Sequence, residues 1–195
     1  MMSKLEPRVP PIPRSEWTDE ARDVFAVLEG PDAWEKGPRV DVIGVLAQHP
    51  HLTRPFLAYN KHLLFQSTLP DRVRELVTLY VAWTTKSDYE WASHVPMGLQ
   101  VGLTDADIEA VKQGPASSHW SAFDRDLLRA VDQMRDNYDL DDALWATLSK
   151  EFDTRQMMDL LFTIGNYIMF SAVLSGLRVP LEARHAEIAK KYGMP

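Results

Sequence analysis

The stretch RELVTLYVAWTTKSDYEWASH, residues 74–94, decides the fold of this chain and carries its candidate chemistry. Apolar residues recur at intervals of three and four in its first half, and this spacing predicts a helix over about 71–84. A second helix is expected over 87–101. Pro96 should kink this helix by removing one backbone hydrogen bond, and Gly102 should end it.

Two tetrads in this region have the sequence of a helix capping box. In SDYE, Ser87 and Glu90 are spaced so that each side chain can satisfy a backbone N–H group of the first helical turn. In TDAD, Thr104 and Asp107 have the same spacing and predict the start of the next helix. We therefore expect both pairs to act as caps.

The rest of the chain also has helical patterns and lacks strand-like alternation of useful length. Further helices are expected over 15–30, 42–47, 56–65, 104–114, 121–138, 141–152 and 154–177, with a loop over 31–41, prolines 50 and 55 as interruptions, and Gly176 as the last C-cap. The sequence thus predicts an all-α protein. Asn166 and Tyr167, in the long apolar helix, are interpreted as core residues, with contact to a ligand as the alternative.

Composition narrows the function. The chain has 195 residues, a formal net charge of -7 and no cysteine. The negative charge argues against a nucleic-acid partner, since phosphate backbones are held by clustered cations. The absence of cysteine excludes disulfide redox chemistry, iron–sulfur clusters and thiolate-bound zinc. No secretory signal is recognised, and the charge-free run 160–177 contains too many polar residues for a membrane span, so a cytoplasmic protein without a membrane partner is expected.

Four residues form a candidate constellation with the spacing Glu75-x11-Ser87-x2-Glu90-x3-His94. Glu90 and His94 lie four residues apart, so they share a helical face and can act as an acid–base pair. Glu75, among apolar neighbours, would need a partner such as His94 if it points inward. A purely structural interpretation is also open, in which Ser87 and Glu90 are caps, Glu75 faces solvent and His94 is an ordinary core histidine.

The segment resembles the central motif of the carboxymuconolactone decarboxylase and alkylhydroperoxidase D-like family, and the similarity continues through HVPMGLQVGLTDADIEAV. The peroxidase branch of that family has a glutamate, two cysteines and a histidine at this spacing. Here they correspond to Glu75, Ser87, Glu90 and His94, so the proton relay remains and both sulfurs are missing. The resemblance implies an alkylhydroperoxidase D-like helical bundle that assembles as a trimer or hexamer. It also implies a division into an N-terminal arm with the first helix, 1–38, and a family domain over 39–195.

These observations predict a cofactor-free, lyase-type enzyme that acts on a small carboxylated or keto substrate, without a metal. His94 is the expected general acid/base, Glu75 orients it and Glu90 carries a second proton. Substrate contacts are predicted for Ser87, Tyr89, Trp91 and Trp83. The alternative is a non-catalytic small-molecule-binding or structural oligomer of the same fold. His49 and His51 are interpreted as loop residues, because positions i and i+2 do not share a helical face.

Overall fold

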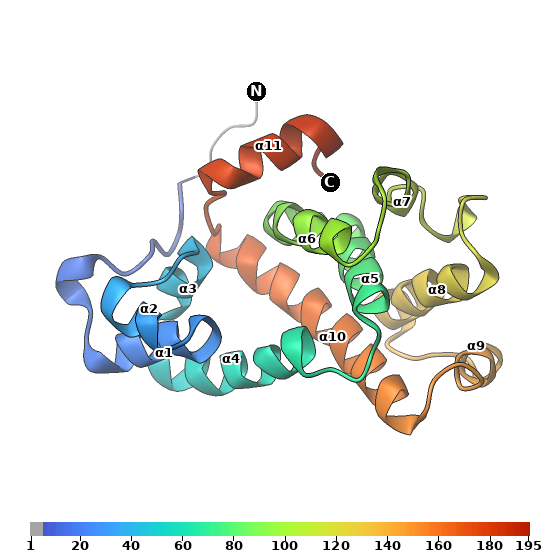
Figure 1. The fold of residues 1–195 in the computed structure, drawn as a ribbon, viewed down its shortest axis with the longest axis horizontal. Coiled ribbons are helices and arrows are strands. Elements are labelled where there is room, and N and C mark those ends of the chain that lie inside the picture. Colours follow the sequence, from blue (N-terminus) through green and yellow to red (C-terminus); the bar gives the residue numbers. More distant parts are fainter. Residues whose placement is uncertain (1–5) are drawn as a thin grey trace. The chain divides into compact units, whose positions relative to one another are not determined.

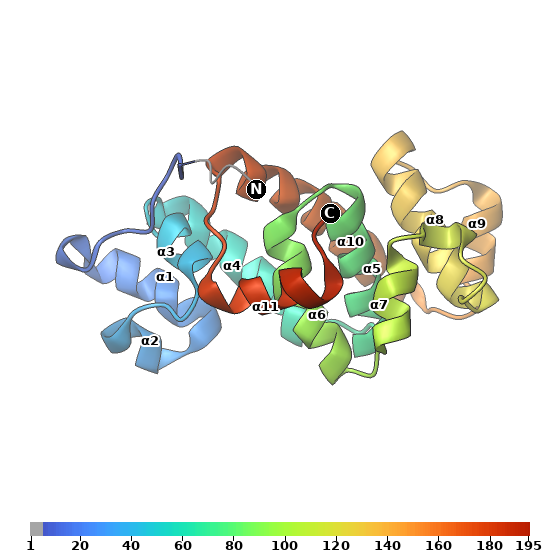
Figure 2. The same cartoon turned by 90° about the horizontal axis from the view of Figure 1, so that it is seen from above.

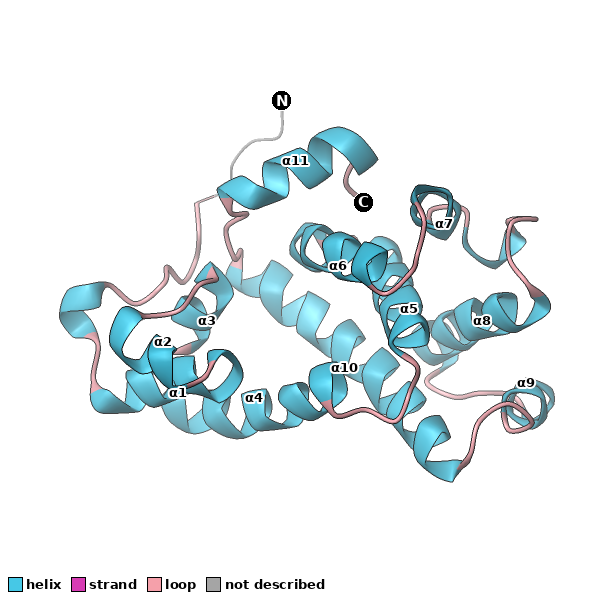
Figure 3. Ribbon diagram, in the orientation of Figure 1, coloured by secondary structure: helices cyan, strands magenta, loops and turns pink. Residues whose placement is uncertain are grey.

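The computed structural model describes residues 6–195, and within that range all regular elements are helices (Figure 3). This confirms the predicted all-α class. The chain divides into two compact units. The first comprises the chain up to Gln66 together with Leu174–Glu182, and the second comprises Ser67–Val173 together with Ala183–Pro195.

The first unit contains one short 3-10 helix and four α-helices (Figure 1). These are η1 (Arg14–Glu16), α1 (Asp19–Glu29), α2 (Pro31–Lys36), α3 (Asp41–Leu46) and α4 (Pro50–Phe65). α1 packs against α2, α3 and α4 and buries Val24 and Phe25 completely. The segment before η1 is held by backbone hydrogen bonds, from Arg8 N–H to the Leu177 carbonyl and from Ile12 N–H to the Gly44 carbonyl. Residue 38, where the sequence predicts a division, lies inside this unit.

Two expectations for this unit are wrong. Residues 31–36 form α2 instead of a loop, because Pro31 takes the first helical position, where no N–H is needed, between Gly30 and Gly37 at positive φ. Pro50 likewise opens α4, and the helix continues through Pro55 instead of stopping there. The side chain of His49 caps α4 by accepting a hydrogen bond from the Leu52 N–H group.

The second unit holds the predicted constellation. Its elements are α5 (Asp71–Thr84), α6 (Asp88–Gln100), α7 (Asp105–Val111), η2 (Gly114–Ala116), α8 (Ala122–Asn137), α9 (Asp142–Leu148), α10 (Thr154–Leu177) and α11 (Ala183–Tyr192). Of α10, the residues up to Val173 belong to this unit. α5 is buried from Val73 to Ala82 without interruption, and it packs closely against α6 (Figure 2). Gly98 allows this approach, because a Cβ atom there would lie 3.0 Å from a methyl group of Leu79.

α10 is confirmed over its whole predicted range, but Gly176 is not its C-cap. Gly176 is still helical, and Arg178 adopts the left-handed conformation instead, with φ of 54°. By length and hydropathy α10 could cross a membrane, a test that the core helix of a soluble protein also passes. It is the one helix among the described residues that does so, and it carries Arg155 and Asp159 in its first two turns.

Candidate active site

His94 lies between two carboxylates in the interior of the second unit. Its Nδ1 atom is 2.8 Å from Glu75 Oε2 and its Nε2 atom is 3.2 Å from Glu90 Oε2. Glu75 is fully buried, and the other two side chains are about 95% buried. The structure thus brings together the three residues that the sequence predicts to be catalytic.

This geometry determines the charge of His94. Burial disfavours the charged imidazolium, but the adjacent carboxylates of Glu75 and then Glu90 outweigh that effect and raise the pKa of His94 from 6.5 to about 10. The same attraction lowers the pKa of Glu75, although its burial works in the opposite direction. At neutral pH His94 is therefore a cation with a proton on each ring nitrogen, and it starts as an acid.

The second oxygen of Glu75 is held by a buried arginine. Arg74 Nε donates to Glu75 Oε1 at 3.1 Å, and Arg74 also donates to Asp71 at 2.5 Å. Both oxygens of Glu75 are therefore occupied, one by Arg74 and one by His94. Asp71, Arg74, Glu75, His94 and Glu90 form a chain of alternating charges. Arg74 and Asp71 were not predicted to belong to the site, although a charged pair within the apolar stripe of α5 indicates such a contact.

Tyr167 contributes to this site from α10. Its ring meets the His94 ring edge-on, with centroids 5.0 Å apart and an interplanar angle of 86°. Burial, and then the charges of Glu90 and Glu75, raise the pKa of Tyr167 well above its usual value, so the phenol keeps its proton. The interpretation of Tyr167 as a core residue is thus incomplete, since it is buried and also in contact with His94.

Buried hydroxyl groups without a hydrogen-bond partner occur on the elements that meet at His94. They belong to Ser87 at the start of α6 and to Thr163 and Ser171 of α10, and all three residues are at most 2% exposed. The hydroxyl of Thr78 on α5 is equally buried, and it interacts with the phenol of Tyr167. Asn166 is also buried with both amide atoms unpartnered. Most buried polar groups in proteins have a partner, so this concentration points to a place that accepts water or a ligand.

The capping box predicted at Ser87 and Glu90 is wrong. Ser87 is the N-cap of α6 by position, but its side chain makes no cap hydrogen bond. Glu90 lies within ion-pair distance of His94, one helical turn further on. An ion pair with an imidazolium inside the protein outweighs a bond to a backbone N–H group that could be satisfied elsewhere.

The aromatic residues predicted to contact substrate have packing partners. Trp91 is fully buried and packs against Trp83 with ring centroids 5.0 Å apart and an interplanar angle of 55°. Its indole N–H donates to the Gly193 carbonyl at 3.0 Å. The Tyr89 ring meets the His185 ring edge-on, also at 5.0 Å. These contacts explain the three residues as parts of the core, and their role in binding stays a prediction.

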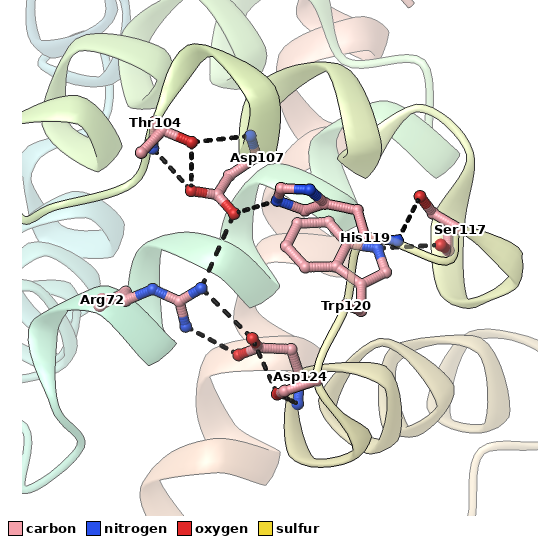
Figure 4. Close-up of polar contacts among 9 residues, drawn as sticks. Arg72, Thr104, Asp107, Ser117, His119, Trp120 and Asp124 are labelled. Atoms are coloured by element: carbon pink, nitrogen blue, oxygen red, sulfur yellow. Dashed lines mark hydrogen bonds and ion pairs between the residues drawn. The ribbon is translucent and has the colours of Figure 1, made fainter.

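A second histidine cluster gives a useful contrast (Figure 4). His119 Nε2 lies 2.7 Å from Asp107 Oδ1, while Asp107 Oδ2 accepts from the backbone and hydroxyl of Thr104. Arg72 binds Asp124 at 2.7 Å and lies 3.9 Å from Asp107. Here the capping box predicted at Thr104 and Asp107 is confirmed. This cluster ties α5, α7 and α8 together, and His119 is 39% exposed.

The described residues contain no cluster of metal-ligating side chains. No group of three or more histidine, aspartate or glutamate side chains within residues 6–195 is arranged to hold a metal ion. The prediction of a cofactor-free enzyme is not tested by this observation and stays a prediction.

Residues 50–133 match the model of the carboxymuconolactone decarboxylase family. This match covers less than half of the chain and includes Glu75, Ser87, Glu90 and His94, so it shows similarity to that family over this segment. A comparison with curated protein sequences gives no significant match.

Solved structures with the same fold include an uncharacterized peroxidase-related protein from Silicibacter sp. TM1040, which is 22% identical with a TM-score of 0.75 over 95% of this chain and 97% of that one. The debrominase Bmp8 is 14% identical, with a TM-score of 0.73 over 98% of this chain and all of the other. An uncharacterized peroxidase-related protein from Ralstonia eutropha JMP134 is also 14% identical, with a TM-score of 0.75 over 93% and 96% of the two chains. At these identities the similarity shows the fold alone.

Proposed function

We propose that the chain is an acid–base enzyme that activates a small keto or carboxylated substrate at His94, without a thiol. The observation that carries this proposal is the position of His94, a buried cation whose two ring nitrogens each face a carboxylate. Thiol peroxidase chemistry is excluded for the residues of this chain, because it has no cysteine.

The arrangement supports a reaction through an enolate. A carbonyl oxygen that replaces Glu90 at Nε2 would accept a hydrogen bond from the imidazolium, and Glu90 would then be free to act as a base. Glu90 would remove a proton from the carbon next to the carbonyl. The electron pair of that C–H bond would move into the new C–C double bond, and the negative oxygen would be stabilised by His94. Return of the proton to another carbon completes an isomerisation, and loss of a leaving group completes an elimination.

Glu75 has a separate task in this scheme. It keeps His94 oriented and charged through Nδ1, and Arg74 holds Glu75 in place from the other side. Carboxylates that fix a histidine in this way set its tautomer and stabilise its charged form. Glu75 and Arg74 are thus positioning residues, whereas His94 and Glu90 touch the substrate.

Turnover of a panel of muconolactones and β-keto compounds, followed by ultraviolet absorbance and carbon dioxide release, tests the proposal. His94→Gln should lower turnover about 10²–10⁴-fold, as expected for a general acid–base residue. His119→Gln is the matched control, because His119 also pairs with a carboxylate, and its turnover should stay at the wild-type level. Equal turnover in the wild type and His94→Gln would contradict the proposal. Ligand stabilisation without product in any variant would favour the binding protein instead.

We also propose that the chain assembles with further copies of itself. α10 exposes Met158 and Met169 to solvent, at 54% and 44%, on the side opposite the buried Tyr167. Exposed apolar residues on one helix face favour association. Light scattering of the purified protein tests this directly, and a monomeric mass at micromolar concentration would contradict it.

A further inference from the structure

The charges around His94 bear on which substrate the site accepts. Three carboxylates (Asp71, Glu75 and Glu90) and two cations (Arg74 and the imidazolium of His94) are linked by ion pairs of at most 3.2 Å. Asp71 is 66% exposed, so the buried part of the cluster is neutral overall and has no positive charge left for an anionic substrate. Arg74 is already paired with Asp71 and Glu75, so its charge is neutralised within the cluster. An anionic substrate would lose its hydration and gain repulsion from Glu90.

The groups left for recognition are uncharged. Ser87, Thr163 and Ser171 each have a buried hydroxyl without a partner, and the buried Thr78 hydroxyl interacts with the uncharged phenol of Tyr167. A hydroxyl can donate one hydrogen bond and accept two, so it suits a carbonyl, a lactone or an alcohol. It offers a carboxylate no compensating charge.

The helical spacing places these hydroxyls on the helix faces that meet at His94. Thr163 and Ser171 lie four residues before and after Tyr167, on the same face of α10, and the Tyr167 ring contacts the His94 ring. Ser87 precedes His94 by seven residues, or two turns of α6. On α5, Thr78 follows Glu75 by three residues, and Glu75 is hydrogen-bonded to His94. Three helices that meet at His94 thus carry buried hydroxyls on the faces that hold His94, Glu75 and Tyr167.

We infer that this site, within the proposed function, selects an uncharged carbonyl compound over its carboxylate analogue, and that the hydroxyl of Thr163 takes part in binding it. The inference depends on the proposed function for the location of the site, and it narrows the substrate class to the keto alternative. It favours isomerisation or elimination on a neutral ketone, ester or lactone over decarboxylation of a free acid.

Isothermal titration calorimetry at pH 7.5 on the intact protein, with two matched pairs of probes, tests the inference. The pairs are methyl acetoacetate with acetoacetate, and acetophenone with benzoate. The neutral member of each pair should bind at least about tenfold more tightly. Stronger binding of the anions, or no binding of either neutral probe, would overturn the inference.

Two variants locate the selectivity. Glu90→Gln removes one negative charge and should narrow the preference for the neutral probe by strengthening binding of the anion. Thr163→Val removes a hydroxyl at nearly constant volume, and it should weaken binding of methyl acetoacetate about tenfold while the melting temperature rises or holds. A hydroxyl with only a structural role would leave that affinity unchanged.

Binding and turnover separate this inference from the proposed function. Neutral probes that bind selectively but are not converted by any variant would leave the inference standing and contradict the enzyme. Turnover that depends on His94, together with tighter binding of anions, would do the reverse.

Discussion

His94 and His119 are both paired with carboxylates at hydrogen-bond distance, yet their surroundings differ. His119 is partly exposed, and its partner Asp107 is also bonded to Thr104 as a helix cap. His94 is buried, faces two carboxylates, and has unpartnered hydroxyls on the helices around it. A histidine–carboxylate pair is therefore not by itself a functional site in this protein. Burial, charge and unsatisfied neighbours distinguish the candidate active site from the structural cluster.

The largest expected difference between the two clusters is in stability. His94→Gln should lower the free energy of unfolding by about 3–5 kcal/mol, because Glu75 and Glu90 would stay buried without their shared cation. His119→Gln should lower it by at most about 1 kcal/mol, as expected for a partly exposed pair. Chemical denaturation of both variants measures the difference. Similar losses would show that the two clusters are equivalent.

Arginine substitutions extend the comparison to the second layer of each cluster. Arg74→Met should destabilise the protein by about 3 kcal/mol, since it removes a cation from the buried Glu75. Arg72→Met should have an effect of about 1 kcal/mol, because the side chain of Arg72 is 36% exposed and its partners keep contact with water. Thermal unfolding of both variants shows which of them loses more stability. A larger loss for Arg72→Met than for Arg74→Met would contradict this prediction.

The dependence of stability on pH provides a third difference. The folded-state pKa of His94, about 10, lies above its ordinary value of 6.5. Its contribution to stability is therefore complete below about pH 6.5, decreases as the pH rises, and is absent above about pH 10. Denaturation of the wild type and His94→Gln between pH 6 and 10.5 should show their stability difference shrinking toward the alkaline end. A constant difference would mean that His94 is neutral in the folded protein.

The smallest expected effect on stability has opposite signs at the His94 site and in the His119 cluster. Thr163→Val should stabilise the protein by about 1 kcal/mol, because it removes a buried hydroxyl that has no partner. Thr104→Val should destabilise it by about 1 kcal/mol, because it removes the cap of α7. Differential scanning fluorimetry of the two variants measures both signs. Destabilisation by both would mean that Thr163 has a partner in solution.

The two capping tetrads show how far the sequence determines the structure. SDYE and TDAD have the same spacing, and TDAD forms the predicted capping box. In SDYE the glutamate pairs with His94 instead. Local pattern was sufficient at Asp107, where the partly exposed His119 binds one carboxylate oxygen and leaves the other for Thr104. It failed where residues brought together by folding offered Glu90 a stronger partner.

The difference between local sequence pattern and contacts made only on folding also explains which other features could be predicted. α5 and α10 could be predicted because their apolar residues recur with helical spacing over several turns. The pairing of Glu75 with His94 followed from the family motif. The contact of Tyr167 with His94 could not be predicted, since the two residues are 73 positions apart in the chain. The polar residues of α10 were also consistent with either a core position or contact with a ligand. Short α2 was missed because six residues carry little periodic signal.

The proposed chemistry depends on the positive charge of His94, and nitrogen NMR of the imidazole rings in uniformly labelled protein measures this charge directly. The His94 signals are assigned by their absence in His94→Gln. At pH 7.5 both ring nitrogens should give the shifts of protonated imidazolium, and they should titrate near pH 10. A neutral ring at pH 7.5, with one unprotonated nitrogen, would contradict the assignment of His94 as the acid.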